Sequence, residues 1–176
     1  MSVNSVHIGE NSIEIGQYQS YVLGFYMKRW WWAYALPLLT CVALSILNIS
    51  FLYAAIILLF LVFTMVLYIV VAFHGVRVEC TYSILPKEIE MNDTGIFLTL
   101  KDKIHQEEED EESEPQYRYL NVDIEWQRIA RIEAKDKCML LMFKHPRYSF
   151  LAVPYDAFED ENHLRAALAV IRSHIS

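Results

Sequence analysis

The feature that most restricts the fold of this chain is an uncharged stretch that begins at Trp30 and ends at Phe73. Its 44 residues include no Asp, Glu, Lys, Arg or His. As a helix it would be about 65 Å long, which is twice the thickness of a hydrocarbon layer of about 30 Å. Asn48-Ile49-Ser50 interrupts the apolar pattern near its middle. We therefore predict a transmembrane helical hairpin over residues 30–74, with spans of about 30–48 and 51–73.

Basic and aromatic side chains flank this hairpin and predict its orientation. Lys28 and Arg29 precede the first span, Arg77 follows the second, and the connecting turn carries no charge. Because Lys and Arg are enriched on the cytoplasmic side of membrane proteins, both termini are expected in the cytoplasm. Tryptophan rings prefer the lipid–water boundary. The predicted membrane-interface residues are therefore Lys28, Arg29, Trp30, Trp31, Trp32 and Arg77.

Residues 1–29 are predicted to form an N-terminal cytoplasmic segment. Ile13 and Ile15 alternate with polar residues, which fits either an edge strand of the C-terminal domain or an unstructured segment. From Gln17 to Arg29, apolar and aromatic residues recur at helical spacing. That helix is either an amphipathic helix at the membrane surface or a cytoplasmic extension of the first span.

Residues 77–176 are predicted to form an antiparallel β domain. Apolar residues alternate with polar ones in the first run, at Val78, Cys80, Tyr82 and Ile84, and similar runs follow along the chain. Turn residues separate the runs, as expected for strands joined by short loops. The predicted strands cover residues 77–84, 88–91, 96–100, 117–124, 129–134, 138–143 and 148–153.

A C-terminal helix is predicted to close this domain. Residues 156–159 resemble a helix N-terminus with a carboxylate three residues on. One helical stripe follows at Leu164, Leu168, Ile171 and Ile175. About seven antiparallel strands closed by a helix are typical of the pleckstrin-homology (PH) superfold. The predicted fold class is thus an α+β membrane protein, with a two-helix transmembrane hairpin and a PH-like β-barrel or sandwich.

A run of carboxylates interrupts the predicted β domain at residues 105–115. Like charges at this density repel one another, so an extended loop is expected. The loop is either a docking strip for a basic protein partner or a solvated connector between two strands. The docking interpretation assigns partner binding to Glu107, Glu108, Glu109, Asp110, Glu111 and Glu112.

The charge of the β domain excludes several kinds of partner. From Glu79 to Ser176 the chain carries 20 acidic and 12 basic residues, a net charge of −8. A domain this acidic does not attract nucleic acid. Specific phosphoinositide binding would need several Lys or Arg residues in the first strand loop, where Lys87 stands beside Glu88 and Glu90. We therefore expect neither ligand.

The sequence contains no arrangement typical of an enzyme. His163 and His174 lie three helical turns apart, about 16 Å, which is too far for one metal ion. Cys41, Cys80 and Cys138 form no CxxC pair and are expected to be buried thiols. No nucleophile elbow, Walker loop or GxGxxG is present. We predict a protein without catalytic residues, metal or cofactor.

Four residues of the β domain carry a family resemblance. Trp126 and Ile129 are separated by two residues, Pro154 follows a strand, and Phe158 precedes the closing helix. With the preceding hairpin anchor, this order resembles the YcxB-like bacterial membrane proteins. The resemblance implies a bacterial inner-membrane protein with a PH-like cytoplasmic part, and it offers no catalytic residues to carry over. The acidic run departs from the short connector expected there.

These observations favour a membrane-anchored, non-catalytic interaction or regulatory module that presents a PH-like domain at the cytoplasmic face. Its expected partners are the lipid bilayer and a protein, which the acidity of the domain predicts to be basic. Two alternatives stay open. One is a small subunit of a homo-oligomeric or transport-associated membrane assembly, and the other is an immunity-type protein that binds a basic partner.

Overall fold

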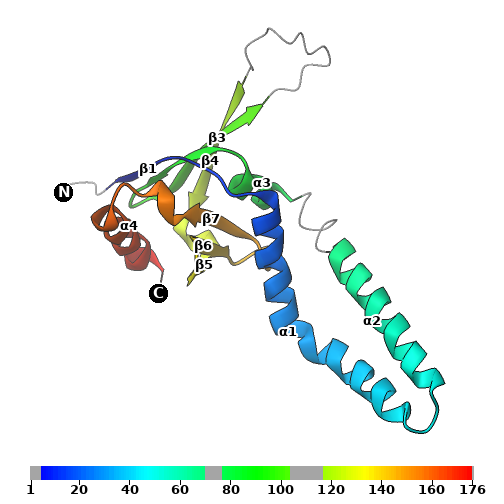
Figure 1. The fold of residues 1–176 in the computed structure, drawn as a ribbon. Helices are drawn as coiled ribbons and strands as arrows, with labels where there is room; N and C mark the ends of the chain where they lie inside the picture. Colours follow the sequence, from blue (N-terminus) through cyan, green and yellow to red (C-terminus); the bar gives the residue numbers. More distant parts are fainter. Residues whose placement is uncertain (1–4, 70–76, 104–116, 176) are drawn as a thin grey trace, which may run out of the picture. The chain divides into compact units, whose positions relative to one another are not determined.

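The structure is a computed structural model that describes residues 5–69, 77–103 and 117–175. The described part is α+β, with four α-helices and two antiparallel sheets (Figure 1). The chain forms two compact units. The first consists of Met1–Tyr18 together with Val78–Ser176, and the second consists of Gln19–Arg77. The elements are β1 (Val6–Asn11), α1 (Ile15–Leu44), α2 (Ser50–Ile69), α3 (Val78–Ile84), β2 (Lys87–Met91), β3 (Gly95–Lys103), β4 (Tyr117–Glu125), η2 (Trp126–Arg128), β5 (Ile129–Ala134), β6 (Cys138–Phe143), β7 (Phe150–Pro154), η3 (Tyr155–Ala157) and α4 (Glu161–His174).

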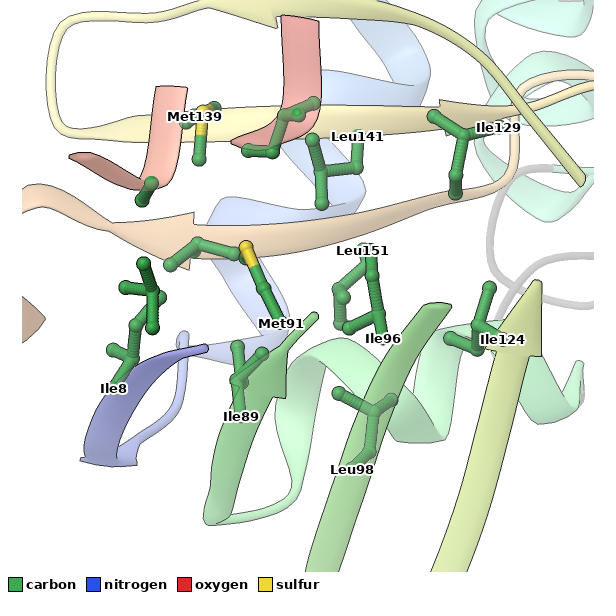
Figure 2. Close-up of a cluster of buried hydrophobic side chains, with 14 of the residues drawn as sticks. Ile8, Ile89, Met91, Ile96, Leu98, Ile124, Ile129, Met139, Leu141 and Leu151 are labelled. Atoms are coloured by element: carbon green, nitrogen blue, oxygen red, sulfur yellow. The ribbon is translucent and has the colours of Figure 1, made fainter. Parts of the chain in front are cut away.

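Two sheets enclose the hydrophobic core of the first unit. One has the strand order β1-β2-β3-β4 and the other β5-β6-β7, and every neighbouring pair is antiparallel. Burial of each large apolar side chain contributes roughly 1.5–3 kcal/mol, so this core is the main source of stability. The prediction of an α+β structure with antiparallel sheets is confirmed. Figure 2 shows Ile8, Ile89, Met91, Ile96, Leu98 and Ile124 of the first sheet with Ile129, Met139, Leu141 and Leu151 of the second.

The first strand of the four-stranded sheet comes from the N-terminal segment. β1 pairs with β2, which places Ile8 opposite Ile89, and both side chains are fully buried. The N-terminal segment therefore does form an edge strand, which was one of the two interpretations. The strand lies before the predicted patch at Ile13 and Ile15. Residues 1–29 were predicted as a separate segment, whereas the observed boundary follows Tyr18.

The segment predicted as the first strand, residues 77–84, contains a helix, and the strand prediction is wrong. α3 buries Cys80 and Ser83, which are three residues apart and share one helical face. The Ser83 hydroxyl donates to the carbonyl of Phe150 (2.9 Å) and accepts from the N–H of Ala152 (3.1 Å). A short amphipathic run fits both periods, and these contacts with the outer edge of β7 favour the helix.

Helix α4 closes the first unit, but it begins later than predicted. Its N-cap is Asp160, whose carboxylate accepts a hydrogen bond from the N–H of His163 (2.6 Å). The predicted start at residues 156–159 is wrong, because the 3₁₀ turn η3 occupies Tyr155–Ala157. The predicted stripe does pack against the core, at Leu164, Leu168, Ile171 and Ile175.

The second unit is built from α1 and α2. Helix α1 continues without a break through Lys28, Arg29 and Pro37, so the predicted N-terminal helix runs on into the uncharged stretch. The helix ends at Leu44, and the turn that follows is capped by the Asn48 side chain, which accepts from the N–H of Ser50.

Only one helix among the described residues is long and apolar enough to cross a membrane. It covers Ser50–Tyr68, with a mean hydropathy of 2.6. The part of α1 from Trp30 to Leu44 is about 22 Å long, which is shorter than a hydrocarbon layer of about 30 Å. Of the two predicted spans, the second corresponds to α2, whereas the part of α1 in the first is too short for a complete span. Residues 70–74 of the predicted hairpin lie outside the described residues.

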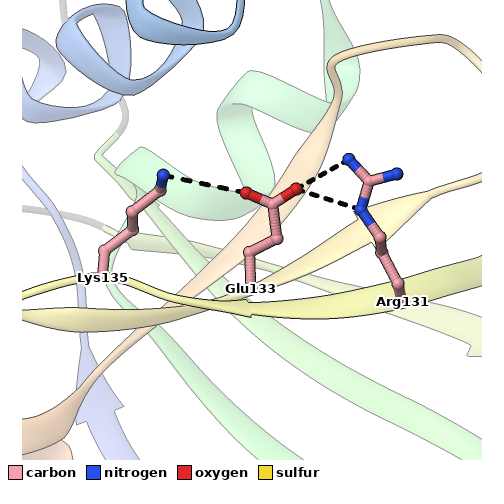
Figure 3. Close-up of polar contacts among 3 residues, drawn as sticks. All are labelled: Arg131, Glu133 and Lys135. Atoms are coloured by element: carbon pink, nitrogen blue, oxygen red, sulfur yellow. Dashed lines mark hydrogen bonds and ion pairs between the residues drawn. The ribbon is translucent and has the colours of Figure 1, made fainter.

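Charged side chains cover one edge of the three-stranded sheet. Arg131 and Glu133 of β5 and Lys135, which directly follows the strand, point to one side (Figure 3). The Arg131 guanidinium donates two hydrogen bonds to Glu133 Oε1, at 3.0 and 2.6 Å, and Lys135 Nζ lies 3.7 Å from Oε2. Exposed ion pairs add little stability, but charges on an edge strand oppose pairing with another chain.

Candidate functional site

The residues predicted at the membrane interface lie on α1 and just before α3. Trp30, Trp31 and Trp32 expose 45%, 61% and 55% of their surfaces, and Lys28 and Arg29 occupy the preceding positions of the same helix. Arg77 directly precedes α3. The six predicted partner-binding residues, Glu107–Glu112, lie outside the described residues.

The residues that carried the family resemblance divide between the core and a cleft. Phe158 is buried and meets the His163 ring edge-on, at a centroid distance of 5.7 Å. Pro154 is the last residue of β7. Trp126 and Ile129 are also buried, and both line a cleft of about 560 Å³. We name it the Trp126 cleft and take it as the candidate site.

Four segments that are distant in sequence build the Trp126 cleft. The turn between β2 and β3 contributes Asp93 and Thr94. The chain around η2 contributes Glu125, Trp126, Gln127, Ile129 and Ala130. The loop after β6 adds Lys144, and the end of α4 adds His174. The cleft therefore exists only when both sheets and the closing helix are assembled.

The β2–β3 turn is held rigidly by one amide side chain. Asn92 Oδ1 accepts hydrogen bonds from the N–H of Thr94 (2.9 Å), the Thr94 hydroxyl (2.6 Å) and the N–H of Gly95 (3.1 Å). This is the Asx-turn chemistry that favours asparagine at such positions. A β-carbon at Gly95 would lie 2.7 Å from the carbonyl oxygen of Ile124, so the turn approaches β4 too closely for any side chain.

The indole of Trp126 joins this turn to α4. Its Nε1 donates to the carbonyl of Asn92 (2.8 Å), and the His174 ring stacks on it at a centroid distance of 5.1 Å. His174 Nδ1 lies 2.9 Å from both the carbonyl of Val170 and the hydroxyl of Ser173. These contacts hold the His174 ring at the end of α4.

Charged groups surround the stacked rings. Asp93 and Glu125 contribute carboxylates, Lys144 contributes an ammonium group, and all three residues are exposed. Within the described ranges, none of the three belongs to an ion pair. The lining therefore holds two carboxylates and one ammonium group, and it holds no cysteine or serine nucleophile.

A second polar cluster is buried next to β7. Lys87 is fully buried, and its Nζ donates to the carbonyl of Ser83 (3.0 Å). Burial disfavours the ammonium form and lowers the pKa of Lys87 to about 7. Burial also raises the pKa of the Cys80 thiol to about 11, which makes a nucleophilic thiolate unfavourable. The cluster lies in the interior, so we treat it as structural.

The described residues contain no group of three or more His, Cys, Asp or Glu side chains placed to hold a metal ion. Sequence reasoning did not identify Asp93, Glu125 or His174 as neighbours, and it considered His174 only as a metal ligand, which it excluded. The available signal was Trp126, since a buried indole near charged turns needs a partner for its N–H.

Comparison of the chain with protein-family models, with curated proteins and with solved structures found no match.

Proposed function

We propose that this protein is a membrane-anchored, non-catalytic interaction module, and the exposure of α2 is the observation that carries the proposal. From Ser50 to Tyr68, every residue except Ala55 and Val66 is exposed or half-buried. Soluble monomers seldom expose a contiguous apolar patch larger than a few hundred Å². A hydrocarbon layer removes this surface from water without any protein partner. Large exposed fractions occur at Ile56 (58%), Ile57 (63%), Phe60 (73%), Leu61 (60%) and Phe63 (63%).

The pairing of β1 with β2 supports a second crossing by α1. These strands are neighbours in one sheet, so Asn11 and Lys87 must lie on the same side of any membrane. The chain between them therefore crosses an even number of times. If α2 crosses once, the uncharged stretch between Trp30 and Asn48 must make the other crossing. We propose this two-helix hairpin, with the turn residues completing the short first span.

The proposed location is a bacterial inner membrane, with both termini in the cytoplasm. Lys28, Arg29 and Arg77 are the charged residues of the Gln19–Arg77 unit, and all are basic. Their excess on one side of the hairpin supports this orientation. The likeness to YcxB-like proteins stays a prediction, as does an immunity-type role.

The first unit is the proposed binding part. Its four-stranded and three-stranded sheets with a closing C-terminal helix support a PH-like fold. In this proposal the Trp126 cleft, which lies in this unit, receives a protein partner. Tethering would hold the cleft close to the membrane, where a second membrane protein is concentrated.

Extraction from membranes tests the anchor. The wild-type protein should remain in the pellet after alkaline carbonate washing. The Ile57→Lys/Phe60→Lys variant should be released, because each lysine costs about 3 kcal/mol at the centre of a membrane helix. The control Glu88→Lys/Asp136→Lys carries two new lysines outside the helices and should stay in the pellet. Release of the wild type by carbonate would refute the anchor.

Accessibility of the connecting turn tests the orientation. An Ile49→Cys variant, in a chain whose three native cysteines are replaced by alanine, should react with an impermeant maleimide in spheroplasts. A Cys at Asp136 of the same background should react only after lysis. The opposite pattern would reverse the proposed orientation.

A subunit role in a homo-oligomer is the remaining alternative. Crosslinking in native membranes separates the two: a ladder of identical subunits would favour the oligomer, and capture of a different protein would favour the interaction module.

A further inference from the structure

We propose that the outer edge of β4 pairs with the β4 edge of a second copy of this chain, in an antiparallel arrangement centred on Asn121. The two sheets of the first unit have four edge strands, namely β1, β4, β5 and β7. An edge strand presents unpaired backbone groups that can bond to another strand. The inference goes beyond the proposed function and does not depend on the membrane anchor.

Three of these four edges are protected against pairing with another chain. Helix α3 covers the edge of β7, where the Ser83 hydroxyl bonds to two backbone groups of that strand. Strand β5 carries the charged residues Arg131 and Glu133 and has an irregular register. Strand β1 has only six residues, also has an irregular register, and contacts α4 and η3. Short, bulged, charged or covered edges resist strand addition.

The edge of β4 has fewer of these protections. The strand is nine residues long, pairs with β3 in an unbroken register, and contains no glycine, proline or lysine. Within the part of the chain that the structure describes, its backbone bonds only to β3. Tyr117 and Tyr119 expose 42% and 63% of their surfaces, and this end of the β3–β4 pair extends away from the other strands (Figure 1). The edge is therefore open to a further strand.

Symmetry restricts how two such edges can pair. A two-fold axis perpendicular to a continuous sheet keeps each face on its own side, so opposing residues must share a face. Only the register centred on Asn121 pairs all nine residues of β4. It places Leu120 opposite the second copy's Val122, and both residues pack against the core of their own copy. The apolar face of the sheet would thus continue from one copy into the next.

The same register gives complementary side chains on the other face. Asp123 and Glu125 of one copy lie opposite Tyr119 and Tyr117 of the other, whose hydroxyl groups can donate hydrogen bonds to the carboxylates. The residues that β3 pairs with these tyrosines are basic, namely Lys101 and Lys103. The acidic end of each strand therefore meets the basic end of its partner. No like charges lie directly opposite one another, an arrangement that would be destabilising.

The net charge of the first unit opposes self-association only at longer range. The unit carries 22 acidic and 12 basic residues, a net charge of −10. In the antiparallel register the two Tyr117 residues are about 27 Å apart, since eight residues separate Tyr117 from Glu125. Charges beyond about 10 Å are largely screened at 0.1 M salt. Because both copies use the same edge, the assembly closes at two and gives a dimer rather than a ladder.

Disulfide crosslinking of the full-length protein in detergent tests the pairing. The native cysteines are replaced by alanine, and Asn121→Cys is added. Opposing residues of antiparallel strands have Cα atoms about 4.5–5.5 Å apart, which a disulfide can bridge. Oxidation should therefore convert most of this variant to a covalent dimer. Asn162→Cys, at an exposed position of α4, is the matched control and should give little dimer.

Two further single-cysteine variants test the register. Tyr119→Cys and Asp123→Cys should form a mixed disulfide when the two proteins are combined, because these positions lie opposite each other. Neither variant alone should form a dimer, since position 119 of one copy lies about 14 Å from position 119 of the other. Equal crosslinking of the mixed and the separate proteins would overturn the proposed register.

A charge at the symmetry axis should weaken the dimer. Asn121→Lys places two ammonium groups opposite each other and should raise the dimer Kd about fivefold, measured by sedimentation equilibrium in detergent. Asn162→Lys makes the same chemical change on α4 and should alter the Kd less than twofold. The apparent Tm of each variant is measured in parallel, so that unfolding is recognised.

Several outcomes would overturn the inference. These are a protein that stays monomeric at about 100 µM, equal effects of the two lysine variants, and equal crosslinking at positions 121 and 162. Crosslinking of position 121 in native membranes only to a different protein would also overturn it, because the edge would then serve a foreign strand. Carbonate extraction of Asn121→Lys tests the anchor separately, since the anchor can hold while the pairing of β4 fails.

Discussion

At the scale of single residues, Lys87 is a charged side chain buried in the core, and its burial lowers the free energy of unfolding. Its ammonium group is removed from water and gains one hydrogen bond, to the carbonyl of Ser83. The pKa falls to about 7 because burial penalises the charged form. The unfolded chain holds this proton up to a pKa near 10.4, so between about pH 7 and pH 10 the unfolded state binds more protons. Stability therefore rises with pH across this window.

Replacing Lys87 with methionine should remove this dependence. At pH 7 and below, Lys87→Met should be more stable than the wild type by a few kcal/mol, since each pKa unit corresponds to about 1.4 kcal/mol. The advantage should shrink as the pH rises towards 10. Apparent Tm values in detergent at several pH values measure it. Lys137→Met removes an exposed lysine and should stay close to the wild type at every pH.

Gly95 gives a second prediction at this scale. Gly95→Ala places a β-carbon 2.7 Å from the backbone oxygen of Ile124, and backbone atoms cannot move away as a flexible side chain could. We expect a loss of roughly 1–3 kcal/mol, as for an overpacked site. Gly9→Ala is the matched control, because a β-carbon there meets no atom within 4 Å. Equal Tm values for the two variants would contradict this account.

At the scale of elements, α3 replaces a missing strand neighbour for β7. One hydroxyl, that of Ser83, serves both the carbonyl of Phe150 and the N–H of Ala152. Ser83→Ala would leave these two buried groups without partners, at a cost of about 2–4 kcal/mol. Ser173→Ala removes an exposed hydroxyl that bonds only locally, and it should cost less than about 0.5 kcal/mol. Thermal unfolding of both variants measures the difference.

Short elements were the ones that sequence reasoning placed wrongly. The strands from β2 to β7 were predicted within a few residues: β2 and β3 alternate clearly, while β6 and β7 are short, continuous apolar runs bounded by turns. In contrast, seven residues around Cys80 fit either period, and contacts with β7 made 67 residues later along the chain favour the helix. The start of α4 was misplaced for a related reason, because Asp156 and Asp160 are both good N-caps and only the structure shows which one accepts.

The candidate site was less predictable than the fold. The chain shows that Trp126 precedes a strand, but it does not show that the Asn92 turn and His174 meet there. Those neighbours depend on the pairing of β2 with β3 and on where α4 ends. The acidic run was a candidate site because its residues are adjacent in sequence. In contrast, Asp93, Glu125 and His174 of the Trp126 cleft are spread over 82 residues.

At the scale of the whole molecule, the folded unit is assembled from both ends of the chain. Ile8→Ala should therefore destabilise the unit by about 2–5 kcal/mol, although α1 and α2 separate it from the other strands. His7→Ala changes an exposed neighbour on the same strand and should have little effect. Trypsin digestion of the full-length protein measures this, since the rate of cleavage follows the population of the opened unit. Equal resistance of the two variants would show that β1 is dispensable.

The position of β1 ahead of both apolar helices has a consequence for biosynthesis. The ribosome synthesises this strand before its partner β2, which begins only at Lys87. During that interval the strand presents unpaired backbone groups and the apolar side chains of Val6 and Ile8. In the proposed hairpin, insertion of the two helices returns the growing chain to the side of the membrane where β1 lies. Slow insertion would then prolong the exposure of this unpaired strand, and we expect chaperone binding to the nascent chain to increase.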